Sequence, residues 1–216
     1  MNTFLRLLAG TAVAALLSAC TTMNFSAYKF EKLGVETVRV VPKEGTPWGY
    51  DIYNETDDDL LLSFQKSAFV LNGDSYRVVS GDSKIIKMDQ ASTDVPVAPQ
   101  AKTSVIFLPP DLLNLKYDKG WKIEWKQYPK DGDKYEFRFV FAKNDGKVLR
   151  STLSGTVHAF HAPVSDANKY ACWGTAIFYG GWCWFLPTSS DLAAGSESAK
   201  KKYGEDVIVE YRNRGP

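Results

Sequence analysis

The chain has 216 residues, of which 44% are hydrophobic and 24% are charged, and its formal net charge is +1. This composition is ordinary for a folded globular protein and argues against wholesale disorder. The nearly neutral charge excludes a polybasic nucleic-acid binder as the default class. Aromatic residues make up 13% of the chain, which favours β-strands.

The first twenty residues have the layout of a secretory signal peptide. Arg6 supplies one positive charge, an apolar run covers residues 7–17, and two small residues follow. This run is too short for a comfortable membrane span. We therefore expect residues 1–19 to be a removable leader.

The end of this leader determines how the chain is processed. Leu17-Ser18-Ala19-Cys20 resembles the lipobox of bacterial lipoproteins. The resemblance implies cleavage before Cys20, which then carries a diacylglyceryl thioether and an amide-linked acyl chain. Three acyl chains hold a protein on a membrane permanently, whereas one binds only marginally. The alternative is a plain secreted protein, which the bulky Leu17 three residues before the cut disfavours.

The residue after Cys20 bears on the destination. It is Thr21, not the aspartate that in Gram-negative lipoproteins resembles an inner-membrane retention signal. By this resemblance we expect an anchor in the outer membrane, with the protein facing the periplasm. Residues 21–34 show no clear period, so we interpret 20–34 as a lipid-anchored tether. Fourteen extended residues reach at most roughly 50 Å, and the body could stand off the bilayer or rest on it.

Short strands with polar turns are expected from residue 35 to residue 162. In Tyr135–Ala142 aromatic side chains alternate with charges, which indicates an antiparallel strand with one buried face. Asn72-Gly73 predicts a tight hairpin, because a type I′ turn needs positive φ at both central residues. The other expected strands are Glu36–Val41, Trp48–Tyr53, Leu60–Phe64, Lys66–Leu71, Tyr76–Val79, Lys84–Met88, Thr103–Leu108, Trp121–Tyr128 and Lys147–Phe160.

This pattern predicts a mainly β fold, an antiparallel β-sandwich. The architecture resembles the immunoglobulin-like domains common in extracytoplasmic lipoproteins, although the Cys…Trp…Cys signature of immunoglobulins is absent. Such a resemblance implies a fold and does not fix a function.

Residues 163–216 read as a C-terminal extension of hydrophobic segment, helix and strand. The helix is expected over SSDLAAGSESAKKKYG, with Ser189 or Ser190 as its cap and Gly204 as its stop. Gly195 weakens this prediction, because glycine disfavours helix interiors. Asp206–Tyr211 is expected to form a closing strand.

Cys172 and Cys183 are the only cysteines besides Cys20. An even pair in an oxidising compartment is typical of a disulfide. Two buried free thiols remain an alternative, as does a redox pair, which the absence of Cys-x-x-Cys disfavours.

The segment 171–187 is uncharged, rich in glycine and aromatic. It could be a buried hairpin, an aromatic loop at the membrane interface, a partner-binding patch or a transmembrane helix. Its glycines, its proline and its short length disfavour the last. Trp and Tyr suit the membrane interface. The candidate membrane- or partner-contact residues are Trp173, Phe178, Tyr179, Trp182 and Trp184.

No motif indicates catalysis, a metal or a cofactor. His158 and His161 differ in parity along a strand, which is poor geometry for a metal pair. The acidic stretches 57–59 and 131–133 fit no EF-hand spacing and are expected to be solvated turns. Asn54-Glu55-Thr56 is formally a glycosylation sequon, without meaning by default in a bacterial lipoprotein.

Three functions remain open at this point. The first is a non-enzymatic envelope lipoprotein that acts as a structural or protein-interaction module with an unknown envelope partner. The alternative is a ligand-binding or transport-assisting lipoprotein, with an aromatic apolar pocket for lipid or glycan. An envelope hydrolase is the third, and it would need a concave site with convergent polar residues.

Overall fold

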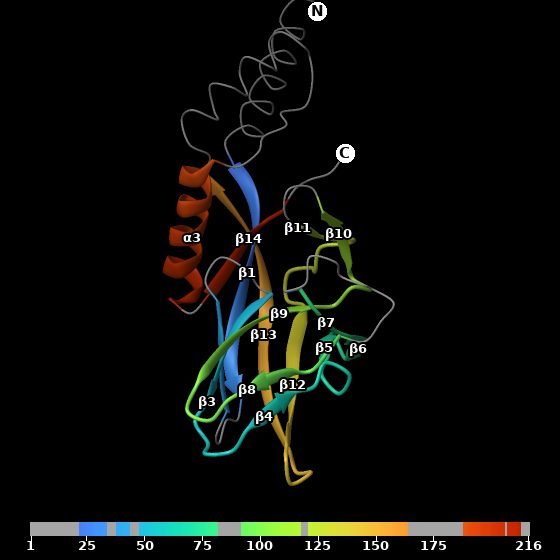
Figure 1. The fold of residues 1–216 in the computed structure, drawn as a ribbon. Coiled ribbons are helices and arrows are strands. Elements are labelled where there is room, and N and C mark those ends of the chain that lie inside the picture. Colours follow the sequence, from blue (N-terminus) through green and yellow to red (C-terminus); the bar gives the residue numbers. More distant parts are fainter. Residues whose placement is uncertain are drawn as a thin grey trace, which may run out of the picture. The chain divides into compact units, whose positions relative to one another are not determined.

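A computed structural model of the chain describes residues 22–33, 38–43, 48–81, 92–117, 121–163, 188–205 and 207–212. These residues form strands and one helix (Figure 1). Every strand pair with an assigned register is antiparallel. The predicted mainly β, antiparallel sandwich class is therefore confirmed, and the immunoglobulin-like topology stays a prediction.

Fourteen strands and a helix are present in the described residues. They are β1 (Thr22–Leu33), β2 (Val38–Pro42), β3 (Gly49–Asn54), β4 (Leu60–Leu62), β5 (Ala68–Leu71), β6 (Asp74–Arg77), β7 (Val79–Ser80), β8 (Val95–Val97), β9 (Lys102–Leu108), β10 (Leu113–Tyr117), β11 (Trp121–Trp125), β12 (Lys134–Lys143), β13 (Val148–Pro163), β14 (Val207–Tyr211) and α3 (Ser189–Tyr203).

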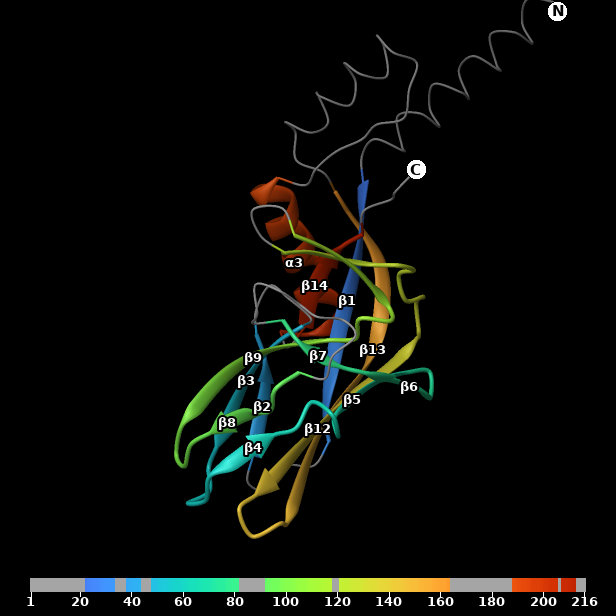
Figure 2. The ribbon, with the colours of Figure 1, turned by 45° about the vertical axis from the view of Figure 1, so that its right-hand side comes forward.

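The strands form three sheets. The largest has the order β14-β1-β13-β12-β4-β8, with β5 beside β12 and β6 beside β5. The second has the order β2-β3-β9-β7, and β10 pairs with β11 in a hairpin. Figure 2 shows β2, β3 and β9 as neighbours in the second sheet.

The chain divides into two units. The sandwich unit comprises Ala27–His158 and Asp206–Glu210, and the helix unit comprises Met1–Ser26, Ala159–Glu205 and Tyr211–Pro216.

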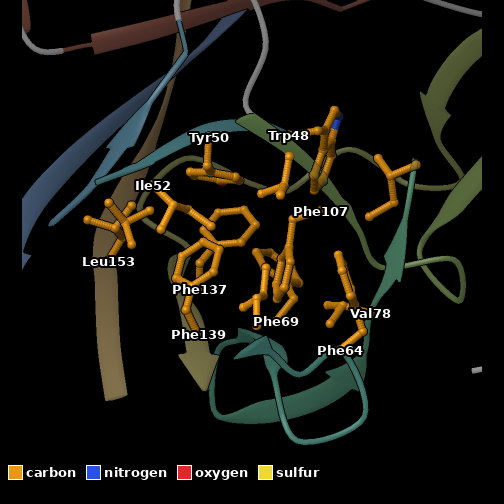
Figure 3. Packing of buried hydrophobic residues seen from close by; sticks show 14 of the residues in the cluster. Trp48, Tyr50, Ile52, Phe64, Phe69, Val78, Phe107, Phe137, Phe139 and Leu153 are labelled. Atoms are coloured by element: carbon orange, nitrogen blue, oxygen red, sulfur yellow. The ribbon is translucent and has the colours of Figure 1, made fainter. Parts of the chain in front are cut away.

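Aromatic side chains fill the core of the sandwich unit. Phe137 from β12 lies 4.9 Å from Tyr50 of β3 and 4.8 Å from Phe69 of β5, measured between ring centroids. Phe107 of β9 lies 4.7 Å from Phe139. The inner faces of the two larger sheets therefore interdigitate through rings (Figure 3). Each such pair is worth about 1 kcal/mol beyond its buried area.

The hairpin of β12 and β13 follows from its sequence pattern. Tyr135, Phe137, Phe139 and Phe141 are buried, as their alternation predicts, and Phe137 lies opposite Leu153. The expected hairpin at Asn72-Gly73 is also present between β5 and β6. Both residues have positive φ, 52° and 94°. The expected strand Lys84–Met88 lies outside the described residues, and Tyr76–Val79 is divided between β6 and β7.

The interpretation of 20–34 as a tether is wrong for Thr22–Leu33, which forms β1. This strand has β14 on one side and β13 on the other. Phe25 and Tyr28 have opposite parity, yet both are buried. A strand covered on both faces shows no alternation, so the lack of a period did not indicate an unstructured linker.

The helix α3 is confirmed, but its predicted cap is wrong. The N-cap is Thr188, one residue before the expected Ser189. Its hydroxyl accepts a hydrogen bond from the backbone N–H of Asp191, whose carboxylate accepts one from the backbone N–H of Thr188. This reciprocal capping box satisfies two donors at once, which a serine one or two residues later could not do with Asp191. Gly204 ends the helix with φ 108°.

Gly195 has a steric reason to lie inside α3. A Cβ added there would lie 2.6 Å from an edge carbon of the Phe25 ring, which is fully buried. Phe25 in turn stacks on Phe160 at 5.5 Å and contacts Tyr211 edge-on at 5.8 Å. The glycine lets the helix backbone approach β1 closely, and this packing outweighs the intrinsic helix penalty of about 1 kcal/mol.

Gly195→Val is therefore expected to destabilise the helix unit by about 1–3 kcal/mol, because the added methyl groups overpack a filled site. Ala193→Val, on the exposed side of the same helix, is the matched control and should cost about 1 kcal/mol or less. Urea unfolding followed by circular dichroism measures both. Equal losses in the two variants would contradict the close approach.

Candidate functional site

The residues singled out from the sequence lie outside the described residues. They are Cys20, Cys172, Cys183, Trp173, Phe178, Tyr179, Trp182 and Trp184. The lipid anchor, the disulfide and the aromatic contact residues accordingly stay predictions. The described residues next to them still show where the chain enters and leaves these segments.

The start of β1 is the described point nearest to the expected anchor. One residue, Thr21, separates Cys20 from Thr22. At this end of the sheet, the backbone N–H of Arg212 donates to the Asn24 carbonyl at 2.9 Å, and the Arg212 guanidinium donates to the Ser26 hydroxyl. The end of β14 therefore lies beside the start of β1.

The end of β13 lies at the same place. Phe160 is three residues before the last residue of β13 and stacks on Phe25, three residues after the first residue of β1. Since adjacent strands rise equally per residue, Pro163 lies level with Thr22. The chain thus leaves the described structure after Pro163 at the start of β1.

The first turn of α3 completes this end of the helix unit. Asp191, in that turn, is fully buried. Burial raises the pKa of the Tyr211 hydroxyl, and the charge of Asp191 raises it further. The Tyr211 ring contacts Phe25, which also packs against Gly195 of α3. Thr22, Pro163, Thr188 and Arg212 together define what we call the strand-end face. Both ends of the segment 164–187 join it.

A hydrogen-bonded carboxylate lies inside the sandwich unit, and the sequence analysis missed it. Glu210 of β14 accepts hydrogen bonds from the Tyr28 hydroxyl at 2.6 Å and from the Trp125 indole N–H at 2.9 Å. Tyr28 and Trp125 are buried, and the Trp125 indole nitrogen lies 3.0 Å from the Tyr28 hydroxyl oxygen. The arrangement ties β14 to β1 and β11 and satisfies polar groups that would be costly to bury unpaired.

An aromatic pocket next to these residues offers little space. The gaps between its side chains add up to about 220 Å³, part of which is open to solvent. This volume is below the roughly 300–1,000 Å³ of ligand pockets. Its lining includes Tyr28, Trp48, Phe69, Trp125, Tyr135 and Phe137. The rings contact one another and leave no room for a water molecule, so this pocket gives no support to a ligand-binding function.

The acidic turns pair with other groups of the same chain. Asp58 pairs with Lys143 at 2.6 Å, and Asp133 accepts hydrogen bonds from the backbone N–H of Lys130 at 2.6 Å and from the Asn72 amide at 3.0 Å. Among the described residues no three His, Cys, Asp or Glu side chains gather in a way that could hold a metal ion.

Asn54 of the sequon is buried and structural. Its side-chain nitrogen lies 2.8 Å from the carbonyl oxygen of Asp58, 3.1 Å from that of Val97 and 3.0 Å from that of Ala98. Its side-chain oxygen accepts hydrogen bonds from the backbone and hydroxyl of Thr56. The amide therefore joins β3 to β8 of the other sheet, and no glycan could be attached to it in the folded unit.

The outer face of β2, β3 and β9 carries a ladder of polar cross-strand contacts. Arg39 lies over the ring of Tyr53, 3.9 Å from its centroid, and pairs with Glu55 at 3.0 Å. Asp51 accepts hydrogen bonds from Ser104 at 2.5 Å and from Lys102 at 3.2 Å. The Ser104 hydrogen bond, helped by Lys102, lowers the pKa of the Asp51 carboxyl.

Comparisons of the chain with protein-family models, with curated proteins and with solved structures found no match. Within the described residues, no helix has the length and apolar character needed to cross a membrane.

Asn54→Ala is expected to destabilise the sandwich unit by about 3 kcal/mol, because the two amide hydrogens shared among the carbonyl oxygens of Asp58, Val97 and Ala98 are lost. Asn144→Ala, in the exposed turn between β12 and β13, is the control and should change stability by less than about 0.5 kcal/mol. Thermal unfolding gives both values. A loss below about 1 kcal/mol for Asn54→Ala would contradict the bridging role.

Asp51 predicts a pH dependence of stability. Its pKa is lower in the folded than in the unfolded chain, so its contribution is full above the unfolded value of about 4 and is lost as the pH falls through the folded value. Asp51→Asn should therefore lower the urea midpoint at neutral pH and leave it nearly unchanged at about pH 2. Asp59→Asn, at an exposed carboxylate, is the control. A midpoint gap of the same size at both pH values would contradict this assignment.

Proposed function

We propose that this protein is a lipoprotein of the cell envelope, anchored in the outer membrane through acyl chains on Cys20 and acting as a non-enzymatic structural or protein-interaction module. The supporting motif is Leu17-Ser18-Ala19-Cys20 at the end of an apolar run. The structural support is that the first described residue, Thr22, lies after the proposed cleavage site. Cleavage before Cys20 removes no described residue, so the mature chain would keep every described strand and the helix.

The segment 164–187 is the proposed contact region. Its aromatic residues Trp173, Phe178, Tyr179, Trp182 and Trp184 would meet the membrane interface or an envelope partner. Support comes from the strand-end face, since both ends of this segment join the helix unit beside the start of β1. A disulfide between Cys172 and Cys183 would cross-link the segment.

A module that binds proteins also needs a surface for them. Sandwich sheets accept partners along edge strands. In the described part of the sandwich unit, β2 (Val38–Pro42) is an edge strand of the four-stranded sheet. This edge supports an interaction role in the periplasm and involves no catalytic group.

Cys20→Ser is expected to abolish labelling by a palmitate analogue in growing cells and to shift the protein out of the membrane fraction, because the thiol is the proposed acyl acceptor. Ser18→Ala is the matched control, since alanine keeps the small residue of the lipobox, and it should label normally. Intact-mass analysis of the membrane form should find the chain beginning at Cys20 with three acyl chains. A wild-type chain that is unlabelled, or that retains residues 1–19, would refute the proposal.

A further inference from the structure

The distance between the proposed anchor and the folded protein is short. Two residue steps separate Cys20 from Thr22, the first residue of β1. Fully extended, they span about 7 Å. The headgroup layer on each side of a bilayer is roughly 5–7 Å thick. The strand therefore begins at the membrane surface, with no length of chain available as a spacer.

The helix unit is the part of the protein that β1 holds at this surface. Residues 22–26 belong to it, and Phe25 packs against Gly195 of α3. Phe25 also contacts Tyr211 edge-on at 5.8 Å between ring centroids, and the backbone N–H of the neighbouring Arg212 donates to the Asn24 carbonyl. Figures 1 and 2 both draw the first turn of α3 at the end of the helix unit where β1 begins.

An exposed leucine lies in this turn of α3. The side chain of Leu192 is 44% exposed, which is the largest exposed fraction of any large hydrophobic residue in the described part of the chain. It is three residues, or about 4.5 Å, closer to the start of α3 than Gly195, which contacts Phe25. Exposed Ser189 and Ser190 precede it in the same turn, whereas the basic residues Lys200, Lys201 and Lys202 are in the last turn, at the other end of the helix.

From this placement we propose that the strand-end face of the helix unit rests directly on the lipid surface, with the first turn of α3 and Leu192 close to the headgroups. The occupant of this face is the bilayer that carries the anchor, so the inference rests on the proposed acylation of Cys20. It assigns the membrane a second contact, made by the folded protein itself. The lipoprotein is then held close to the bilayer instead of moving freely at the end of a tether.

The test is photo-cross-linking of the acylated full-length protein in vesicles of phosphatidylethanolamine and phosphatidylglycerol. A benzoylphenylalanine replaces Leu192, and in a second variant it replaces Lys201, the matched control, which is exposed in the last turn of α3 within the same unit. We expect at least fivefold more lipid adduct from position 192 than from position 201. A third variant, with twenty Gly and Ser residues inserted between Thr21 and Thr22, should reduce the yield at position 192 to that of position 201.

Intact mass, measured on the same samples, separates the two proposals. If the protein is acylated and the two positions give equal yields, the membrane contact is overturned and the anchor stands. If the inserted spacer leaves the yield at position 192 unchanged, the short connection is not its cause, and the inference is overturned as well. If the protein carries no acyl chain, the proposed function fails and the inference fails with it.

Discussion

The placement of β1 between β14 and β13 is the constraint on which the rest of the structure depends. Its backbone pairs with β14, the last strand of the chain, and with β13, which ends at Pro163. Its side chains serve both units, since Phe25 packs within the helix unit and Tyr28 bonds to Glu210 within the sandwich unit. Pairing within the sheet thus makes the chain regular from Thr22 onward, two residues after Cys20, the residue proposed to carry the anchor.

Within each unit, close aromatic contacts hold the elements together. In the sandwich unit, rings from β12 interdigitate with rings from β3, β5 and β9 around Phe137. In the helix unit, Phe25 lies against the backbone of α3, where only a glycine fits. In the sandwich unit the Asn54 amide and the Glu210 carboxylate are hydrogen-bonded to groups from other strands.

Local patterns predicted most of the sheet correctly. Alternation identified β12, and Asn72-Gly73 identified the turn between β5 and β6, because each signal depends only on neighbouring residues. The same reasoning failed for β1, which is covered on both faces and so has no alternation to detect. It also missed the set of Tyr28, Trp125 and Glu210. These residues are far apart in the chain, and only the pairing of strands brings them together.

The sequence by itself determined the mainly β class and the helix before the last strand, and it predicts a leader that ends in a lipobox, since each of these is encoded in contiguous residues. Tertiary structure alone decided what those residues are next to. It placed Thr22, Pro163, Thr188 and Arg212 at one end of the helix unit, and it turned an expected tether into a paired strand. The reason is physical: hydrogen bonds between strands and contacts between rings join segments that are more than a hundred residues apart, and no local pattern records which segments will meet.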